Sequence, residues 1–447
     1  MRNPLLKQEL TARQKEVLSL LRKGFTNSEI CKVLNISENT VKVHLSKIYK
    51  AMDVTNRTEA ASLEMEDEKP AEASSEVKIL FVHKDISDNP EMNRLCFTLI
   101  ENLHRFHLFH IQKSSEDTDS ANFTYRIVVT ETLGVKPTLY LSLYRRHSTD
   151  ILWTSSQKVD ESSDIEFLAS QITIQLLRQQ KIDAAKSFAL GENAAPRWWF
   201  VCNYADMKMD CRCQESFDTC TQELEALCAE KNAHPYTAFM LARVYYTAIT
   251  ESWIDPQAYT LKQQKLACTA MRDNPYSCYS QFMMAFFNIL VGNKKDAITY
   301  LMQIADANPQ DVLARRILSQ VYLLTGQEAK ALELINDSER YAPDLANDPN
   351  QVIPKAFIYL LLKKYDECEN LVMQAAYIRP ESPYPRLFAI VCNVVKGNMA
   401  AVEMHKKEFL KYHPNFNLPD ILSLLKGIDP AKQQALISIM ESVFSPK

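Results

Sequence analysis

The chain has 447 residues, 46% of them hydrophobic, 11 cysteines and a formal net charge of −4. Its length predicts about three globular domains, and the absence of any run of about 18 apolar residues disfavours a membrane-spanning protein. Only 7 residues are glycine, and the sequence contains no glycine-rich phosphate loop, nucleophile elbow or zinc-protease motif. We therefore expect no enzyme and no cofactor.

The first 58 residues are basic, with 11 Lys or Arg against 5 Asp or Glu, and they predict three short helices. Thr11 is placed to cap a helix that runs to Arg22, and a shorter helix begins at Asn27. A third helix follows Ser37, which is a good N-cap, and it repeats apolar residues at helical spacing. These apolar residues are Val41, Leu45, Ile48 and Met52. Two helices joined by a short turn predict a helix-turn-helix motif.

The opposite face of the third helix must meet solvent or a ligand. Its side chains combine hydrogen-bonding groups, a methyl-bearing valine and lysines that suit phosphates, which is the chemistry that a DNA major groove requires. A solvated lysine-rich surface is the alternative interpretation. The candidate DNA-binding residues on this face and its flanks are Asn39, Thr40, Lys42, Val43, Ser46, Lys47 and Lys50.

Four stretches of this head carry a family resemblance. They are LTARQKEVL from Leu10, GFTNSEI from Gly24, SENTVKVH from Ser37 and NRTEA from Asn56. They resemble the LuxR/GerE helix-turn-helix family over roughly residues 8–62. The resemblance implies a DNA-binding domain at residues 1–63 that acts as a dimer, with a fourth helix around residues 56–63 as the dimer contact. It also assigns base contacts to Lys42, Val43 and Ser46 and phosphate contacts to Lys47 and Lys50, and Arg57 completes the candidate DNA-binding set.

The composition becomes acidic directly after the head. Residues 59–76 contain seven acidic side chains and one lysine, so residues 64–77 are expected to form a linker. A solvated tether is the simplest interpretation. A linker that competes with DNA for the basic face is the alternative.

Residues 78–182 predict a small α/β domain. A strand, a helix and a second strand come first, three alternating strands follow, and a helix ends the segment. This order predicts a β-α-β unit continued by a meander, in one sheet under two helices. The expected strands are 78–83, 108–112, 123–131, 138–144 and 151–158, and the expected helices are 90–103 and 164–177.

Three stretches of this segment carry a second resemblance: YLSLY at 140–144, ILWTS at 151–155 and DI at 164–165. They resemble the TolB-like N-terminal domain that lies between DNA-binding heads and helical repeats in CadC-like and related bacterial regulators. The resemblance implies a signalling or assembly module and no individual site residue.

Two clusters of residues could in principle bind a metal ion. His104, His107 and His110 cross from a helix into a strand and have no Cys or carboxylate partner to complete a tetrahedral set. Five cysteines follow between residues 202 and 228, but they lack paired C-x-x-C spacing. We expect packed helix cysteines and no metal, with metal or redox sensing by Cys202, Cys211, Cys213, Cys220 and Cys228 as the alternative.

The C-terminal half is repetitive. Gly292, Gly326, Lys363 and Gly397 each precede a proline by 17 residues, and the offsets between them are 34, 37 and 34. Five residues after each of these positions stands a small or apolar residue, and the next inward positions are apolar as well. These residues are Ala297, Ala331, Cys368 and Val402, followed by Leu301, Ile335 and Val372, and Tyr322 and Tyr359 also match. The period predicts stacked helical hairpins with a glycine-type turn and a proline stop.

This pattern resembles the tetratricopeptide repeat, a helical hairpin of 34 residues that stacks into a superhelix. We expect five or six hairpins in residues 196–447, and a helix over residues 418–444 could cap the open end. A concave surface that binds a peptide, a protein or a small effector is the functional interpretation. A purely structural solenoid or a dimerisation arm is the alternative.

Together these features predict a multidomain protein with an all-α helix-turn-helix head, a small α/β domain and an α-solenoid of tetratricopeptide-like hairpins. We expect a bacterial, sequence-specific DNA-binding transcription regulator that works as a homodimer and senses a ligand through its repeats. The N-terminus has no signal-peptide pattern and the cysteines give no disulfide framework, so a cytoplasmic location is expected. The competing interpretation is an interaction scaffold whose head does not bind DNA.

Overall fold

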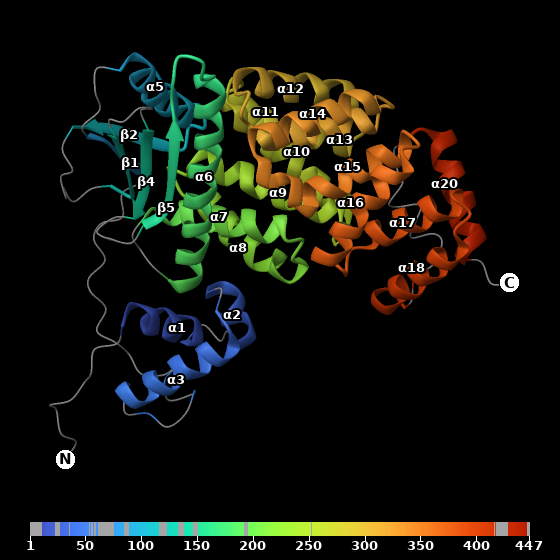
Figure 1. Cartoon of the computed structure of the whole chain (residues 1–447), viewed down its shortest axis with the longest axis horizontal. Helices are drawn as coiled ribbons and strands as arrows, with labels where there is room; N and C mark the ends of the chain where they lie inside the picture. Colours follow the sequence, from blue (N-terminus) through green and yellow to red (C-terminus); the bar gives the residue numbers. More distant parts are fainter. Residues whose placement is uncertain are drawn as a thin grey trace. The chain divides into compact units, whose positions relative to one another are not determined.

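The computed structural model describes most of the chain. The described residues are 11–22, 27–34, 36–52, 54, 57, 60, 76–84, 89–115, 123–132, 138–145, 151–191, 195–251, 253–414, 416 and 428–444. The chain divides into two compact units, one of residues 1–165 and 176–244 and the other of residues 166–175 and 245–447. Figure 1 shows the head, the sheet and the helical array in chain order. No helix among the described residues is long and apolar enough to span a bilayer.

The head contains the three expected helices, α1 (Ala12–Arg22), α2 (Asn27–Leu34) and α3 (Glu38–Met52). The cap at Thr11 is confirmed, because its hydroxyl accepts a hydrogen bond from the Gln14 amide at 3.3 Å. The Thr11 amide in turn donates to the Oε1 of Gln14 at 2.8 Å, which completes a capping box. The apolar stripes meet in one buried cluster formed by Val17, Leu18, Leu20, Leu21, Ile30, Leu34, Val41, Leu45 and Ile48. Of the proposed dimer helix at 56–63 only Arg57 and Ala60 are among the described residues, and nearly all of the acidic linker lies outside them.

The α/β segment contains the five expected strands in a single mixed sheet. They are β1 (Val77–Lys84), β2 (Phe109–Ser114), β3 (Tyr125–Thr132), β4 (Thr138–Arg145) and β5 (Ile151–Lys158). Their order in the sheet is β2-β1-β3-β4-β5, in which β1 pairs parallel with both β2 and β3, and the remaining pairs are antiparallel. A β-α-β unit followed by a meander is therefore confirmed.

Two helices accompany the sheet, α5 (Pro90–His104) and α6 (Ile165–Leu190). The second is longer than the expected 164–177, and the sequence interpretation was wrong on this point. No glycine or proline interrupts residues 178–190, so the helix continues until Gly191 adopts a φ of 76°. The expected end of the α/β domain at residue 182 consequently lies inside a continuous helix.

A buried polar network ties the sheet to α6 and to the next helix, α7 (Arg197–Asp210). The Tyr125 hydroxyl on β3 lies 3.2 Å from the Asp183 carboxylate and 3.1 Å from the Gln180 carbonyl, both on α6. The Trp199 indole on α7 donates to the same hydroxyl at 3.2 Å. Arg145 on β4 pairs with Asp183. Burial, followed by the nearby Asp183 charge, raises the pKa of Tyr125 well above its ordinary value, so the phenol stays protonated as this network requires.

Helices occupy the rest of the described chain. In order they are α8 (Phe217–Cys228), α9 (Pro235–Thr250), α10 (Pro256–Asp273), α11 (Cys278–Leu290), α12 (Lys294–Ala307), α13 (Val312–Leu323), α14 (Glu328–Tyr341), α15 (Pro349–Leu361), α16 (Tyr365–Ile378), α17 (Pro383–Val395), α18 (Met399–Tyr412) and α20 (Pro430–Phe444), with short 3-10 turns at Gln214–Ser216 and Pro343–Asn347. Four neighbouring pairs of these helices enclose the turns marked by the 17-residue spacing, namely α11–α12, α13–α14, α15–α16 and α17–α18. Residues 418–427 of the expected end helix lie outside the described residues.

The four turns marked by the 17-residue spacing share one geometry. Gly292, Gly326, Lys363 and Gly397 all have a positive φ, at 82°, 72°, 60° and 73° respectively. One residue later, the backbone amide donates to a carbonyl five positions back, at 2.8–2.9 Å in all four turns. This is the Schellman arrangement that ends a helix on a left-handed residue. The repeat deduced from the sequence is therefore confirmed, including the position at which lysine replaces glycine.

These turns permit a prediction about stability. A methyl group added at Gly326 would meet no atom within 4 Å, so Gly326→Ala tests the left-handed backbone alone. We expect it to lower the free energy of unfolding by about 1 kcal/mol, and Lys363→Gly to raise it by about 0.5–1 kcal/mol. Urea denaturation of the full chain measures both. A loss of stability in Lys363→Gly would contradict the shared turn geometry.

Candidate nucleic-acid interface

The orientation of α3 is fixed by the turn that precedes it. The Ile36 amide donates to the Cys31 carbonyl at 3.2 Å, which ends α2 in a tight turn. Ser37 then caps α3, because its hydroxyl accepts a hydrogen bond from the Thr40 amide at 3.2 Å. The turn between the two helices is thus short and well bonded, as a helix-turn-helix motif requires.

Arg13 is a positioning residue that the sequence analysis did not identify. Its guanidinium on α1 donates to the Leu34 carbonyl at the end of α2, at 2.6 Å, and also pairs with Glu16. The bond satisfies one of the carbonyls left free at the end of a helix. Because the two residues are 21 positions apart, no local spacing could have revealed this contact.

The two faces of α3 separate as the sequence predicted. Val41, Leu45 and Ile48 are buried, and Met52 is half-buried against the same cluster. The opposite face lies open, and its valine is 52% exposed although it is apolar. Six candidate residues share this exposed surface: Asn39, Lys42, Val43, Ser46, Lys47 and Lys50. We call this set the outer face of α3.

Two further candidates have partners inside the head. Thr40 is half-buried, and its hydroxyl lies 2.8 Å from that of Ser37. Arg57 is half-buried too, and its guanidinium donates to the Asn27 side chain at the start of α2, at 3.3 Å. Both residues therefore help to hold the head together, and their contact with DNA remains a prediction.

The charge on the outer face is available to a ligand. Lys42 lies 3.3 Å from Glu38, but both side chains are more than half exposed. An exposed ion pair of this kind contributes about 0–1 kcal/mol, so Lys42 can exchange Glu38 for a phosphate or a base at little cost. The face can thus supply ammonium groups to phosphates and methyl, hydroxyl and amide groups to base edges.

The histidine and cysteine clusters considered in the sequence analysis show no metal-site geometry among the described residues. His104, His107 and His110 are all exposed, and they lie at the end of α5, in a turn and on β2. Among the five clustered cysteines, burial raises the pKa of the Cys220 thiol to about 12 and that of Cys228 to about 11, so these thiols are protonated at neutral pH. The described part of the chain contains no group of three or more His, Cys, Asp or Glu side chains placed to hold a metal ion.

Comparison with known proteins gives a match for the head. Residues 8–63 match the family described as bacterial regulatory proteins, luxR family. The CsgBAC operon transcriptional regulatory protein of Escherichia coli strain K12 is 55% identical over 53 residues, which are 12% of this chain and 24% of that protein. YhjB of the same organism, named as a candidate HTH-type transcriptional regulator, is 48% identical over 56 residues, 12% of this chain and 28% of that protein. The chain therefore spans about a quarter of the length of these relatives.

The helical part has distant structural neighbours. A thermophilic TPR protein of Thermus thermophilus, TTC0263, covers 46% of this chain and 99% of its own at 16% identity, with a TM-score of 0.33. A score of this size does not establish a shared fold. The hairpin repeat of this chain rests on its own turns and helix bounds.

Proposed function

We propose that this protein is a bacterial, cytoplasmic transcription regulator that binds specific DNA sequences through the outer face of α3. One observation carries the proposal: a short, capped helix presents three lysines beside a valine that stays half exposed, while the opposite stripe forms the core of the head. An exposed valine beside lysines matches the mixed apolar and ionic contacts that a DNA major groove offers. The luxR-family match of residues 8–63 supports the same function.

The proposed contacts follow from the chemistry of each side chain. Lys47 and Lys50 neutralise phosphates, which gives affinity without sequence preference. Lys42 and Ser46 donate to base edges, and the methyl groups of Val43 contact thymine. Asn39, Thr40 and Arg57 complete the contact surface at its margins.

The remaining domains would control the head. We assign the five-stranded unit to a TolB-like module, supported by its β-α-β and meander order. We assign the helical array to a tetratricopeptide-like arm that senses a peptide, a protein or a small effector, supported by its four identical turns. The protein would read two half-sites as a homodimer. No catalytic step enters this proposal.

Selection from a pool of random duplexes tests the proposed function. The wild-type chain is expected to enrich one motif, and Val43→Ala or Lys42→Ala is expected to cost about 1–3 kcal/mol on that motif and to relax the choice of base. Lys47→Ala, which removes a phosphate contact, serves as the matched control and should weaken binding to all duplexes alike. A pool that shows no enriched motif would overturn the sequence-specific part of the proposal.

A further inference from the structure

The C-terminal helix α20 reaches across several of the helical hairpins. At its start, Lys432 pairs with the carboxylate of Glu328, the first residue of α14. At its end, the Lys406 ammonium on α18 donates to the Val443 carbonyl at 2.6 Å. The Phe444 ring also lies 5.7 Å from that of Phe409, centre to centre. A helix of 15 residues is about 22 Å long, which suffices to connect these points.

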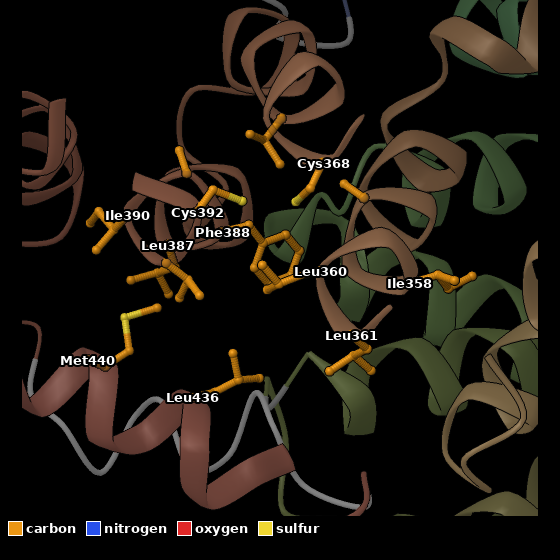
Figure 2. Close-up of a cluster of buried hydrophobic side chains, with 14 of the residues drawn as sticks. Ile358, Leu360, Leu361, Cys368, Leu387, Phe388, Ile390, Cys392, Leu436 and Met440 are labelled. Atoms are coloured by element: carbon orange, nitrogen blue, oxygen red, sulfur yellow. The ribbon is translucent and has the colours of Figure 1, made fainter. Parts of the chain in front are cut away.

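The middle of α20 packs on the ends and flanks of the hairpin helices. Leu436 and Met440 are its two buried residues, and they belong to the same cluster as Leu361 of α15 and Leu387 of α17. Figure 2 shows Leu436 and Met440 pointing from α20 toward these leucines. Ile437, Ile439, Val443 and Phe444 are partly buried against the same cluster, so α20 is bound along one broad apolar face.

One stripe along this face of α20 has regularly spaced residues. Lys432, Leu436, Met440 and Phe444 follow one another at intervals of four residues, which places them on one side of a helix. A cation thus precedes three large apolar side chains. The solvent side of α20 carries Gln434, Ser438 and Glu441, which are all exposed.

The hairpin helices that receive α20 bury more of their own residues than α20 does. In α17, eight of 13 residues are buried, whereas α20 buries only two of 15. The hairpins are held by Cys368, Val372, Cys392 and Val402, which lie between paired helices. Undocking of α20 would expose an apolar strip with the otherwise buried carboxylate of Glu328 at one end.

We propose that this strip is the ligand-binding surface of the helical arm and that α20 occupies it in the resting protein. Its partner would be an amphipathic helix of another protein, with a cation followed by large apolar residues four, eight and twelve positions later. The buried Glu328 selects the cation, and Leu361 and Leu387 select the apolar residues. Because α20 is part of the same chain, it lowers the apparent affinity of the partner until it is displaced. This inference rests on the proposed role of the arm as the ligand-sensing part.

A labelled peptide with the sequence of residues 428–444 is the probe for this surface, used on the full-length chain. In Leu436→Glu/Met440→Glu, the charged side chains disfavour docking of α20, and we expect the peptide to bind at least about tenfold more tightly than to the wild type. The matched control, Gln434→Glu/Ser438→Glu, adds the same charge on the solvent side of α20 and should bind like the wild type. A peptide that carries the two glutamates should not bind any of the three chains.

Equal binding of the peptide to the double-glutamate variant and to the wild type would overturn the proposal and leave α20 as a structural cap. If the double-glutamate variant loses helical content beyond α20, Lys432→Glu replaces it, since this change acts only at the exposed end of the stripe, and about threefold tighter binding is expected. If the double-glutamate variant forms dimers and does not bind the peptide, the strip is occupied by the α20 of a second copy. This result would also contradict the proposal. The peptide-binding experiment contains no DNA. A negative result would therefore count against the proposed strip and would leave the proposed DNA binding untouched.

Discussion

Replacement of Lys42, Lys47 and Lys50 together by alanine is expected to reduce the affinity for the preferred duplex about 10³-fold at 0.1 M salt. Two of these lysines are assigned to phosphates, and each phosphate contact contributes about 0.9 to the slope of log affinity against log salt concentration. The third is assigned to a base, where a lost contact costs about 1–3 kcal/mol. All three side chains are exposed on α3, so their removal should leave the head folded.

Fluorescence anisotropy with a labelled duplex measures this loss. The matched control is a triple alanine variant at Lys231, Lys265 and Lys407, which lie elsewhere in the chain outside its core and change the net charge equally. The control should bind within about twofold of the wild type, because long-range effects of distant charges are screened at this ionic strength. A similar loss in both variants would show that net charge, and not the outer face of α3, carries the affinity.

Asp183→Ala is expected to produce the largest loss of stability, about 3 kcal/mol in the free energy of unfolding. The carboxylate is 6% exposed and pairs with Arg145, whose side chain is 27% exposed, and with the Tyr125 hydroxyl at 3.2 Å. Its removal takes away the buried carboxylate that the Arg145 guanidinium contacts, and it also removes one acceptor from the phenol. Because Arg145 retains some contact with water, the loss should lie at the lower end of the range for broken buried pairs.

Denaturation followed by tryptophan fluorescence checks this value, because Trp199 donates to Tyr125 and so reports on the network directly. The control is Asp273→Ala, which breaks an exposed pair with Arg272 and should cost less than about 1 kcal/mol. The double variant Asp183→Ala/Arg145→Met should recover part of the loss, since it removes the guanidinium together with the carboxylate that it contacts. No recovery would mean that the phenol, and not the ion pair, depends on Asp183.

Local patterns in the sequence were sufficient to predict much of this fold. Residue patterns located all five strands, three of them by alternation, and the 17-residue spacing located four turns. The spacing identified even Lys363, which adopts a left-handed φ of 60° without being glycine. In α3, the interval between Val41 and Leu45 was enough to separate the buried face from the outer face. These features depend on neighbours along the chain, so the sequence encodes them locally.

Contacts between residues far apart in the sequence could not be predicted. The bond from Arg13 to the Leu34 carbonyl spans 21 positions, and the pair of Lys432 with Glu328 spans 104. The length of α6 was also underestimated, because residues 178–190 show no clear amphipathic period, and only Gly191 marks the end of the helix. The two long-range contacts are decided by tertiary packing, for which one sequence contains no direct signal.

The most direct test of the account is the binding of the full wild-type chain to its selected duplex in a series of salt concentrations. The account predicts saturable binding, with log affinity falling against log salt at a slope steeper than about −1.8, and a slope shallower by about that amount in the variant that lacks Lys47 and Lys50. Binding that is absent at low ionic strength, or a slope that is the same in both proteins, would contradict the assignment of the outer face of α3 to DNA.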